Sequence, residues 1–182
     1  MTKLITNAQA LELYGNPGTG DEPDPAWVRE HIVTFQGMKA LPGIPSRFYL
    51  AVHKDIADPL RKALEAARKA APWYTIQRAG CFVFLRVRWD TLAQAEHEHR
   101  PLRPLSLHAW GIAIDLDPAQ NSAHDFGDHP PPRPWSSTWV KLWPDGLPMQ
   151  FVEAMEAAGF DWGGRWSLCD PMHFQIKAPE DE

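Results

Sequence analysis

Residues 106–117, SLHAWGIAIDLD, constrain this 182-residue chain most, because ionisable side chains interrupt a segment that is otherwise typical of a buried strand. The apolar run around them favours β structure inside a core. His108 and Asp115 stand seven positions apart in it, with the small residues Gly111 and Ala113 between them. A buried ionisable side chain needs a polar or charged partner. The segment therefore predicts a strand that carries a polar site into the interior.

The remaining patterns mix helices and strands without regular βαβ alternation, which favours an α+β fold with a small antiparallel sheet and flanking helices. Residues 55–70 give the clearest helix, with an apolar residue every three or four positions. No GxGxxG or GxxxxGK[ST] run points to nucleotide binding. One domain over residues 1–182 suits this length. Further predicted elements are helices over 7–14, capped by Asn7, and 149–160, and strands over 31–36, 47–52, 74–77, 81–89, 113–117 and 173–177.

Charge and composition argue against nucleic-acid and membrane partners. The net charge is −5, and Arg86, Arg88, Arg100 and Arg103 form the nearest approach to a basic cluster. No window reaches the length of apolar chain that a membrane helix needs. The first residues lack the apolar core of a signal peptide, so we expect a cytoplasmic protein. In such a compartment, Cys81 and Cys169 are expected to be free and buried. A monomer is the default expectation.

Residues 118–148 are rich in proline and show little periodicity. A stretch of this length without regular structure is uncommon inside a compact domain unless it has a function. Trp135, Trp139 and Trp143 lie in it. They either form a lid over a cleft or anchor the stretch to the body of the protein.

Two of the eight histidines stand out, because each lies beside a segment that looks buried and has a carboxylate close in sequence. They are His108, with Asp115, and His173, with Asp170. Zinc in catalytic sites takes three protein ligands from such groups and keeps a fourth position for water. His108, Asp115 and His173 would supply that set, leaving Asp170 free as a general base. The other histidines are interpreted as solvated loop residues (His97, His99, His124, His129) or as structural ones (His31, His53).

Two motifs resemble those of the M15 family of zinc peptidases. Residues 106–115 fit the family pattern S-x-H-x-x-G-x-A-x-D at every fixed position. Residues 170–174, DPMHF, resemble its second motif, an acidic residue three before a histidine and an aromatic residue after it. The resemblance covers about residues 74–177. It implies a zinc cleft with His108, Asp115 and His173 as ligands, Asp170 as the catalytic acid/base, and peptidoglycan stem peptides as the partner.

The resemblance also implies a substrate class. Aspartate at position 170 and the run WGGRW before it look closer to the L-alanyl-D-glutamate endopeptidases of phage endolysin type, which would reach the cell wall during lysis. Open alternatives are a D-Ala-D-Ala carboxypeptidase and a non-catalytic wall-binding or virion module. The family places an arginine upstream of the first motif to hold a substrate carboxylate, a role for Arg86 or Arg88. Ser106 would lie at the mouth of the site, and Trp110 and Trp162 would line the cleft or pack beneath it.

Overall fold

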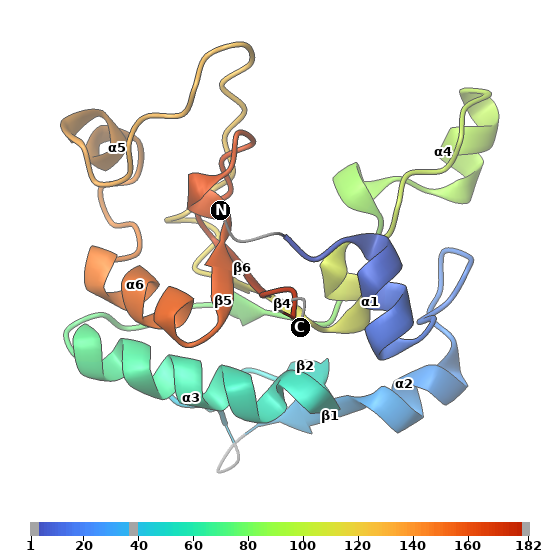
Figure 1. Cartoon of the computed structure of the whole chain (residues 1–182), viewed down its shortest axis with the longest axis horizontal. Helices are drawn as coiled ribbons and strands as arrows, with labels where there is room; N and C mark the ends of the chain where they lie inside the picture. The colour runs from blue at the N-terminus through green and yellow to red at the C-terminus, as the bar shows by residue number, and fades with distance from the viewer. Residues whose placement is uncertain (1–3, 37–39, 180–182) are drawn as a thin grey trace.

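The computed structural model describes residues 4–36 and 40–179, and it confirms the α+β class: in these residues helices surround two small antiparallel sheets (Figure 1). The α-helices are α1 (Asn7–Tyr14), α2 (Pro25–His31), α3 (Lys54–Ala70), α4 (Leu92–His97), α5 (Ser137–Leu142) and α6 (Met149–Ala157). The strands are β1 (Ile32–Phe35), β2 (Leu50–His53), β3 (Ala79–Gly80), β4 (Ala113–Leu116), β5 (Phe160–Trp162) and β6 (His173–Ile176). Short 3-10 turns are η2 (Val87–Trp89), η3 (Leu107–Trp110) and η4 (Gly163–Arg165).

The larger sheet carries the polar segment that the sequence singled out. Its strand order is β3-β4-β6-β5, with every neighbouring pair antiparallel. In this register Asp115 lies directly opposite His173, and Ile114 lies opposite Phe174. Since neighbours along a strand point to opposite faces, one face of the sheet presents Asp115 and His173 while the other buries Ile114 and Phe174 completely. The sheet thus separates a polar site from an apolar core.

Helix α3 forms the base of that core, as its sequence predicts. Its apolar positions Ile56, Leu60, Leu64 and Ala67 are all buried, because a spacing of three or four residues places them on one face. This face contacts α6, which lies alongside it (Figure 1). Burying one leucine side chain contributes about 1.5–3 kcal/mol, so this face stabilises the fold, and α6 in turn contacts β5 of the larger sheet.

The predicted strands 74–77 and 81–89 are wrong as regular strands, and only Ala79–Gly80 pairs within a sheet here. The buried side chain of Asp117 explains the first case. Its carboxylate accepts hydrogen bonds from the backbone N–H groups of Gln77 and Arg78 and from the Tyr74 hydroxyl. A side chain that takes backbone donors competes with strand pairing.

Smaller differences concern the ends of elements and short segments. Thr6 rather than Asn7 caps α1, through a capping box with Gln9. The second predicted strand begins only at Leu50. Helix α2 and strand β5 were not predicted, because each is short: α2 is seven residues long and β5 three. The predictions for 31–36, 55–70, 149–160 and 173–177 are confirmed to within a few residues at each end.

The proline-rich segment is anchored by its tryptophans. Trp139 and Trp143 are almost fully buried, and Trp135 stacks on Trp162 with ring centroids 5.2 Å apart. The indole N–H groups of Trp135 and Trp143 donate to the carbonyls of Leu147 and Ser122. Of the two roles left open for these tryptophans, the structure supports the anchor.

Two further expectations concern single side chains and the membrane. Cys81 and Cys169 are free and buried, as predicted. Across residues 4–36 and 40–179, we find no helix with both the length and the apolar character needed to span a bilayer. That residues 1–182 form one peptidase domain stays a prediction.

Candidate metal centre

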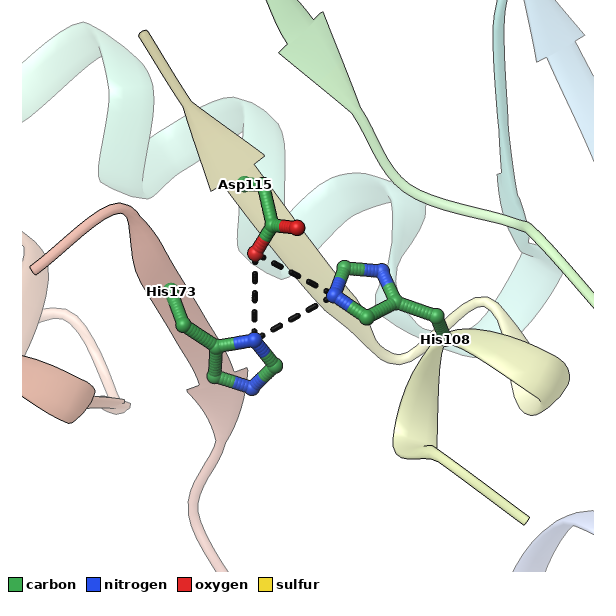
Figure 2. A group of neighbouring side chains, drawn as sticks. All are labelled: His108, Asp115 and His173. Atoms are coloured by element: carbon green, nitrogen blue, oxygen red, sulfur yellow. Dashed lines mark hydrogen bonds and ion pairs between the residues drawn. The ribbon is translucent and has the colours of Figure 1, made fainter. Parts of the chain in front are cut away.

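Three side chains that are far apart in sequence converge on one point of the larger sheet (Figure 2). The converging atoms are Nε2 of His108, Oδ1 of Asp115 and Nδ1 of His173. Each pair of these atoms is 3.1–3.2 Å apart. Both imidazoles are buried, and the carboxylate side chain is 31% exposed, so the point they share opens to solvent on the carboxylate side.

Each residue is held by a different local structure. Asp115 and His173 face each other across β4 and β6. His108 lies on the η3 turn, not on a strand, which corrects the expectation of a continuous strand over this segment. The Ser106 hydroxyl accepts a hydrogen bond from the His108 N–H and so caps that turn. Gly111 ends it with φ of +68°, and a Cβ there would lie 2.8 Å from the backbone nitrogen of His53. Glycine therefore lets the turn close against β2.

The hydrogen bonds on the far side of each ring fix which nitrogen faces the shared point. Nδ1 of His108 lies 2.6 Å from the carbonyl oxygen of Cys81, and Nε2 of His173 lies 3.3 Å from Oε1 of Gln175. Both partners are acceptors, so in neutral imidazoles these outer nitrogens carry the N–H. The inner nitrogens then present lone pairs. In that neutral form three acceptor atoms would face one another, an arrangement that a cation would stabilise, whether a proton on one of the rings or a metal ion.

This donor set fits zinc. Two imidazole nitrogens and one carboxylate oxygen are the ligands of many catalytic zinc sites, with a fourth position left for water. In a tetrahedron with bonds of about 2.0–2.1 Å, ligand atoms lie about 3.3–3.4 Å apart, close to the separations that the three atoms have here. The outer hydrogen bonds to Cys81 and Gln175 are of the kind that orient ligating histidines. His108, Asp115 and His173 therefore could hold a zinc ion without rearrangement.

The electrostatics of the centre keep a negative charge in it at neutral pH. Burial raises the pKa of Asp115, but the hydrogen bonds and charges of His108 and His173 outweigh this and bring it below its usual range. Burial lowers the pKa of His108, but Asp115 and the Cys81 carbonyl reverse this, and the net pKa is raised. The ionised carboxylate thus attracts a positive charge, whether that charge is a proton or a metal ion.

Asp170 lies in the turn that leads into His173. Its carbonyl accepts the His173 N–H, and its own N–H donates to the carbonyl of Gly163. Its Oδ1 is buried and has no hydrogen-bond partner. Burial raises the pKa of this carboxyl, the charge of Asp115 adds to the rise, and His173 and His108 oppose it. A carboxylate with a raised pKa and a free oxygen is suited to taking up and returning a proton.

The run WGGRW holds this turn in place. Trp162 is buried, and its indole donates to the carbonyl of Pro171. A Cβ at Gly163 would lie 2.5 Å from the carbonyl oxygen of Asp170, and one at Gly164 would lie 2.3 Å from the Trp162 ring. Gly163 therefore allows the segment to press against Asp170, and Gly164 allows it to pack on the Trp162 ring. Trp166 then packs on His173, with ring centroids 5.3 Å apart.

Of the five predicted substrate-binding residues, Arg86, Ser106, Trp110 and Trp162 make structural hydrogen bonds. The buried guanidinium of Arg86 donates to the carbonyls of Thr19, Gly20 and Arg103. It also borders a pocket of about 180 Å³, and its Nε is buried without a partner. Arg88 is exposed, on a left-handed backbone with φ of 59°. Trp110 is buried, and its indole donates to the carbonyl of Gly15. Substrate contacts by Arg86, Arg88, Ser106, Trp110 and Trp162 stay predictions.

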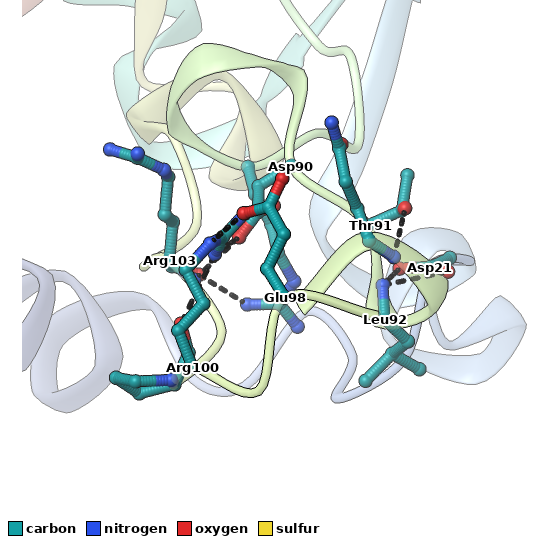
Figure 3. A network of polar contacts seen from close by, with 10 residues as sticks. Asp21, Asp90, Thr91, Leu92, Glu98, Arg100 and Arg103 are labelled. Atoms are coloured by element: carbon teal, nitrogen blue, oxygen red, sulfur yellow. Dashed lines mark hydrogen bonds and ion pairs between the residues drawn. The ribbon is translucent and has the colours of Figure 1, made fainter. Parts of the chain in front are cut away.

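Beside Arg86, a second polar network joins the segment that follows it (Figure 3). Asp90 is buried and accepts two hydrogen bonds from the Arg100 guanidinium and one from the Arg103 N–H. The Asp21 carboxylate accepts the N–H of Leu92 at the start of α4. Within the weak basic cluster of the sequence, the Arg100 side chain and the Arg103 backbone are thus bound to one buried carboxylate.

Sequence reasoning missed three groups at the centre. The Cys81 carbonyl has no side-chain signal at all. Gln175 could have been found, since it lies two positions after His173 on a strand and therefore on the same face. Trp166 lies inside a run that the sequence had singled out, but nothing in that run indicates contact with His173.

Comparison with known proteins agrees with the two motifs. Residues 100–176, somewhat less than half of the chain, match a family model of the M15 peptidases that is described as D-alanyl-D-alanine carboxypeptidase. The match includes all three converging side chains and Asp170. No curated protein and no solved structure matches the chain.

Proposed function

We propose that this chain, whose residues 100–176 belong to the M15 peptidase family, is a zinc-dependent endopeptidase of peptidoglycan stem peptides. The observation that carries the proposal is the convergence of His108, Asp115 and His173 within a family of peptidases that act on such substrates. The proposed bond is that between L-alanine and D-glutamate. Aspartate at position 170 and the WGGRW run favour this bond by their resemblance to the endolysin branch.

In the proposed mechanism His108, Asp115 and His173 would hold the ion, and Asp170 moves the protons. A zinc ion at such a site lowers the pKa of bound water to about 7 and polarises a carbonyl. With the outer nitrogens carrying the N–H, neutral His108 and His173 would turn their inner nitrogens to the ion. The unpartnered Oδ1 of Asp170 takes a proton from the attacking water. The same carboxyl then delivers that proton to the leaving amine nitrogen as the C–N bond breaks.

A second candidate is a D-Ala-D-Ala carboxypeptidase, which the description of the matching family favours. Both reactions use the same ligands and the same acid/base. They differ in the substrate carboxylate: a carboxypeptidase must hold the free C-terminus beside the scissile bond, whereas an endopeptidase must accept a chain that continues beyond it. A role in phage lysis accompanies the endopeptidase alone.

Mass spectrometry of the products from a defined muropeptide tests the proposal. The zinc-loaded protein is incubated with a muropeptide that carries a full pentapeptide stem, and metal-free protein serves as the control. Release of the stem peptide after L-alanine is the expected result. Loss of only the terminal D-alanine would instead establish the carboxypeptidase. If neither product forms, a non-catalytic wall-binding module becomes the better assignment.

A further inference from the structure

Strand β6 carries a second polar side chain on the face that holds the metal centre. Gln175 follows His173 by two positions, so both side chains point to the same face of the sheet. Gln175 is 4% exposed, and its Oε1 lies 3.3 Å from Nε2 of His173. This amide is the only side chain that contacts the outer nitrogen of either histidine in the described part of the chain, since the His108 ring is held by a backbone carbonyl.

That difference matters because an amide can present either of two groups. With Oε1 towards His173, Gln175 accepts a hydrogen bond, and the proton stays on Nε2. With its NH₂ group in the same place, it would donate to Nε2 and move the proton to Nδ1. The second arrangement puts an N–H among the three converging atoms, where it blocks the lone pair that a metal needs. The orientation of one amide thus decides whether the centre is ready for an ion.

Asp161 supplies a physical reason for the first orientation. It lies directly opposite Gln175 in the β5–β6 register, so the two side chains share a face. Side chains in such pairs start from Cβ atoms about 4.5–5.5 Å apart. Asp161 is buried, and its Oδ2 has no hydrogen-bond partner. The structure records no hydrogen bond between the two side chains, so Asp161 acts on the amide through its charge alone, which favours the NH₂ end on its own side and the amide oxygen facing His173.

We propose that Gln175 is a positioning residue that keeps the proton of His173 on Nε2 and so selects Nδ1 as its metal-binding atom. The inference rests on the proposed metal-dependent function. Gln175 acts through His173 and touches neither ion nor substrate. Its effect belongs to metal affinity and to the tautomer of one imidazole, and both can be measured without any peptide substrate.

Nitrogen-15 NMR of the metal-free protein reads the tautomer directly at about pH 8, above the usual imidazole pKa. In the wild-type chain we expect His173 to carry its proton on Nε2. In Gln175→Leu the preference is lost, and zinc affinity, measured by chelator competition, falls about 10- to 100-fold. Gln175→Glu keeps an acceptor at this position and should retain the tautomer and the zinc affinity, at a cost in stability because its carboxylate lies opposite that of Asp161. Gln150→Leu, at an exposed position of α6, is the matched control and should change neither.

Separate outcomes distinguish this inference from the proposed function. A proton on Nδ1 of His173 in the wild-type chain overturns the role of Gln175, and so does unchanged zinc affinity in Gln175→Leu. A wild-type chain that binds no zinc overturns the proposed function itself. Should Gln175→Leu fail to fold, the wild-type tautomer and the affinity of Gln175→Glu still decide the question.

Discussion

Asp170 shows how one residue can be prepared for chemistry by the backbone around it. Its N–H and carbonyl are used in the turn between Gly163 and His173, while Oδ1 is left buried and unpartnered. An unpaired buried oxygen costs stability. A cost of this kind is retained where a group must stay free to exchange a proton.

Asp170→Asn separates proton transfer from metal binding. The amide has nearly the shape of the carboxyl but cannot take a proton from water. We expect zinc content to stay at the wild-type level while kcat on the muropeptide falls about 10²- to 10⁴-fold, the usual contribution of a general base. Metal analysis and product quantification on the same preparation check this. Near-normal turnover would remove Asp170 from the mechanism.

At the residue scale the sequence predicted the side chains of the centre but not their supports. His108, Asp115, His173 and Asp170 were named from their types, spacing and resemblance, and the first three do converge. The support for His108 is a carbonyl oxygen of residue 81, and every residue has one. A backbone group that gains its role only through folding leaves no mark in a sequence.

At the scale of elements, the segment that contains Arg86 shows where strand propensity fails as a guide. Residues 81–89 have the composition of a strand, yet they meet the chain at 104–108 through isolated bonds and one bridge, Arg86 to Leu105. The Arg86 guanidinium supplies what regular pairing does not, by joining three carbonyls from two other segments. Long-range partners of this kind cannot be inferred from local pattern.

Arg86→Ala is expected to destabilise the protein, because it leaves the carbonyls of Thr19, Gly20 and Arg103 without their charged donor. We expect the free energy of unfolding to drop by about 2–4 kcal/mol. Arg88→Ala, at an exposed position nearby, should change it by less than about 0.5 kcal/mol. Urea denaturation measures both.

The same two variants also test the substrate role that the resemblance implies. An arginine that holds a substrate carboxylate raises KM when it is removed, whatever happens to stability. Wild-type stability in Arg86→Ala would contradict the structural role described above. An unchanged KM in both variants would show that neither arginine holds the substrate carboxylate.

At the scale of the whole molecule, buried ion pairs link stability to pH. The hydrogen bonds from Arg100 are the main cause that lowers the pKa of Asp90, and the Arg103 N–H adds to it. An unfolded aspartate has a pKa of about 3.9. Because the folded value is lower, the stabilisation is present above pH 3.9 or so and is lost as the pH falls towards the folded value.

Asp90→Asn should therefore flatten the acid side of the stability curve. We expect the variant to be less stable than the wild type at neutral pH and to lose less stability on acidification. Urea midpoints from about pH 7 down to about pH 3 measure the difference. Any bound metal would be lost in acid from both proteins alike, so that effect cancels in the comparison. Two parallel curves would show that Asp90 does not contribute in this way.

The molecule as a whole was predictable in class but not in layout. Sequence pattern located α3, β1, α6 and β6 to within a few residues, because strong local patterns survive tertiary context. It could not show that α3 packs on α6, or that the tryptophans of 118–148 turn inward to meet Trp162. Those contacts join residues that are distant in the chain, and their partners are chosen by the fold.

The pairing of β4 with β6 has a thermodynamic consequence. It joins Asp115 to His173 across 58 positions of chain, so the entropy of closing that long loop is lost when the sheet forms rather than when an ion arrives. Ligand binding that requires this sheet shares one linked equilibrium with folding. A destabilising substitution far from the centre, even one beneath α3, would then lower apparent zinc affinity once it populates the unfolded state. Added zinc would in turn raise the melting temperature of every such variant.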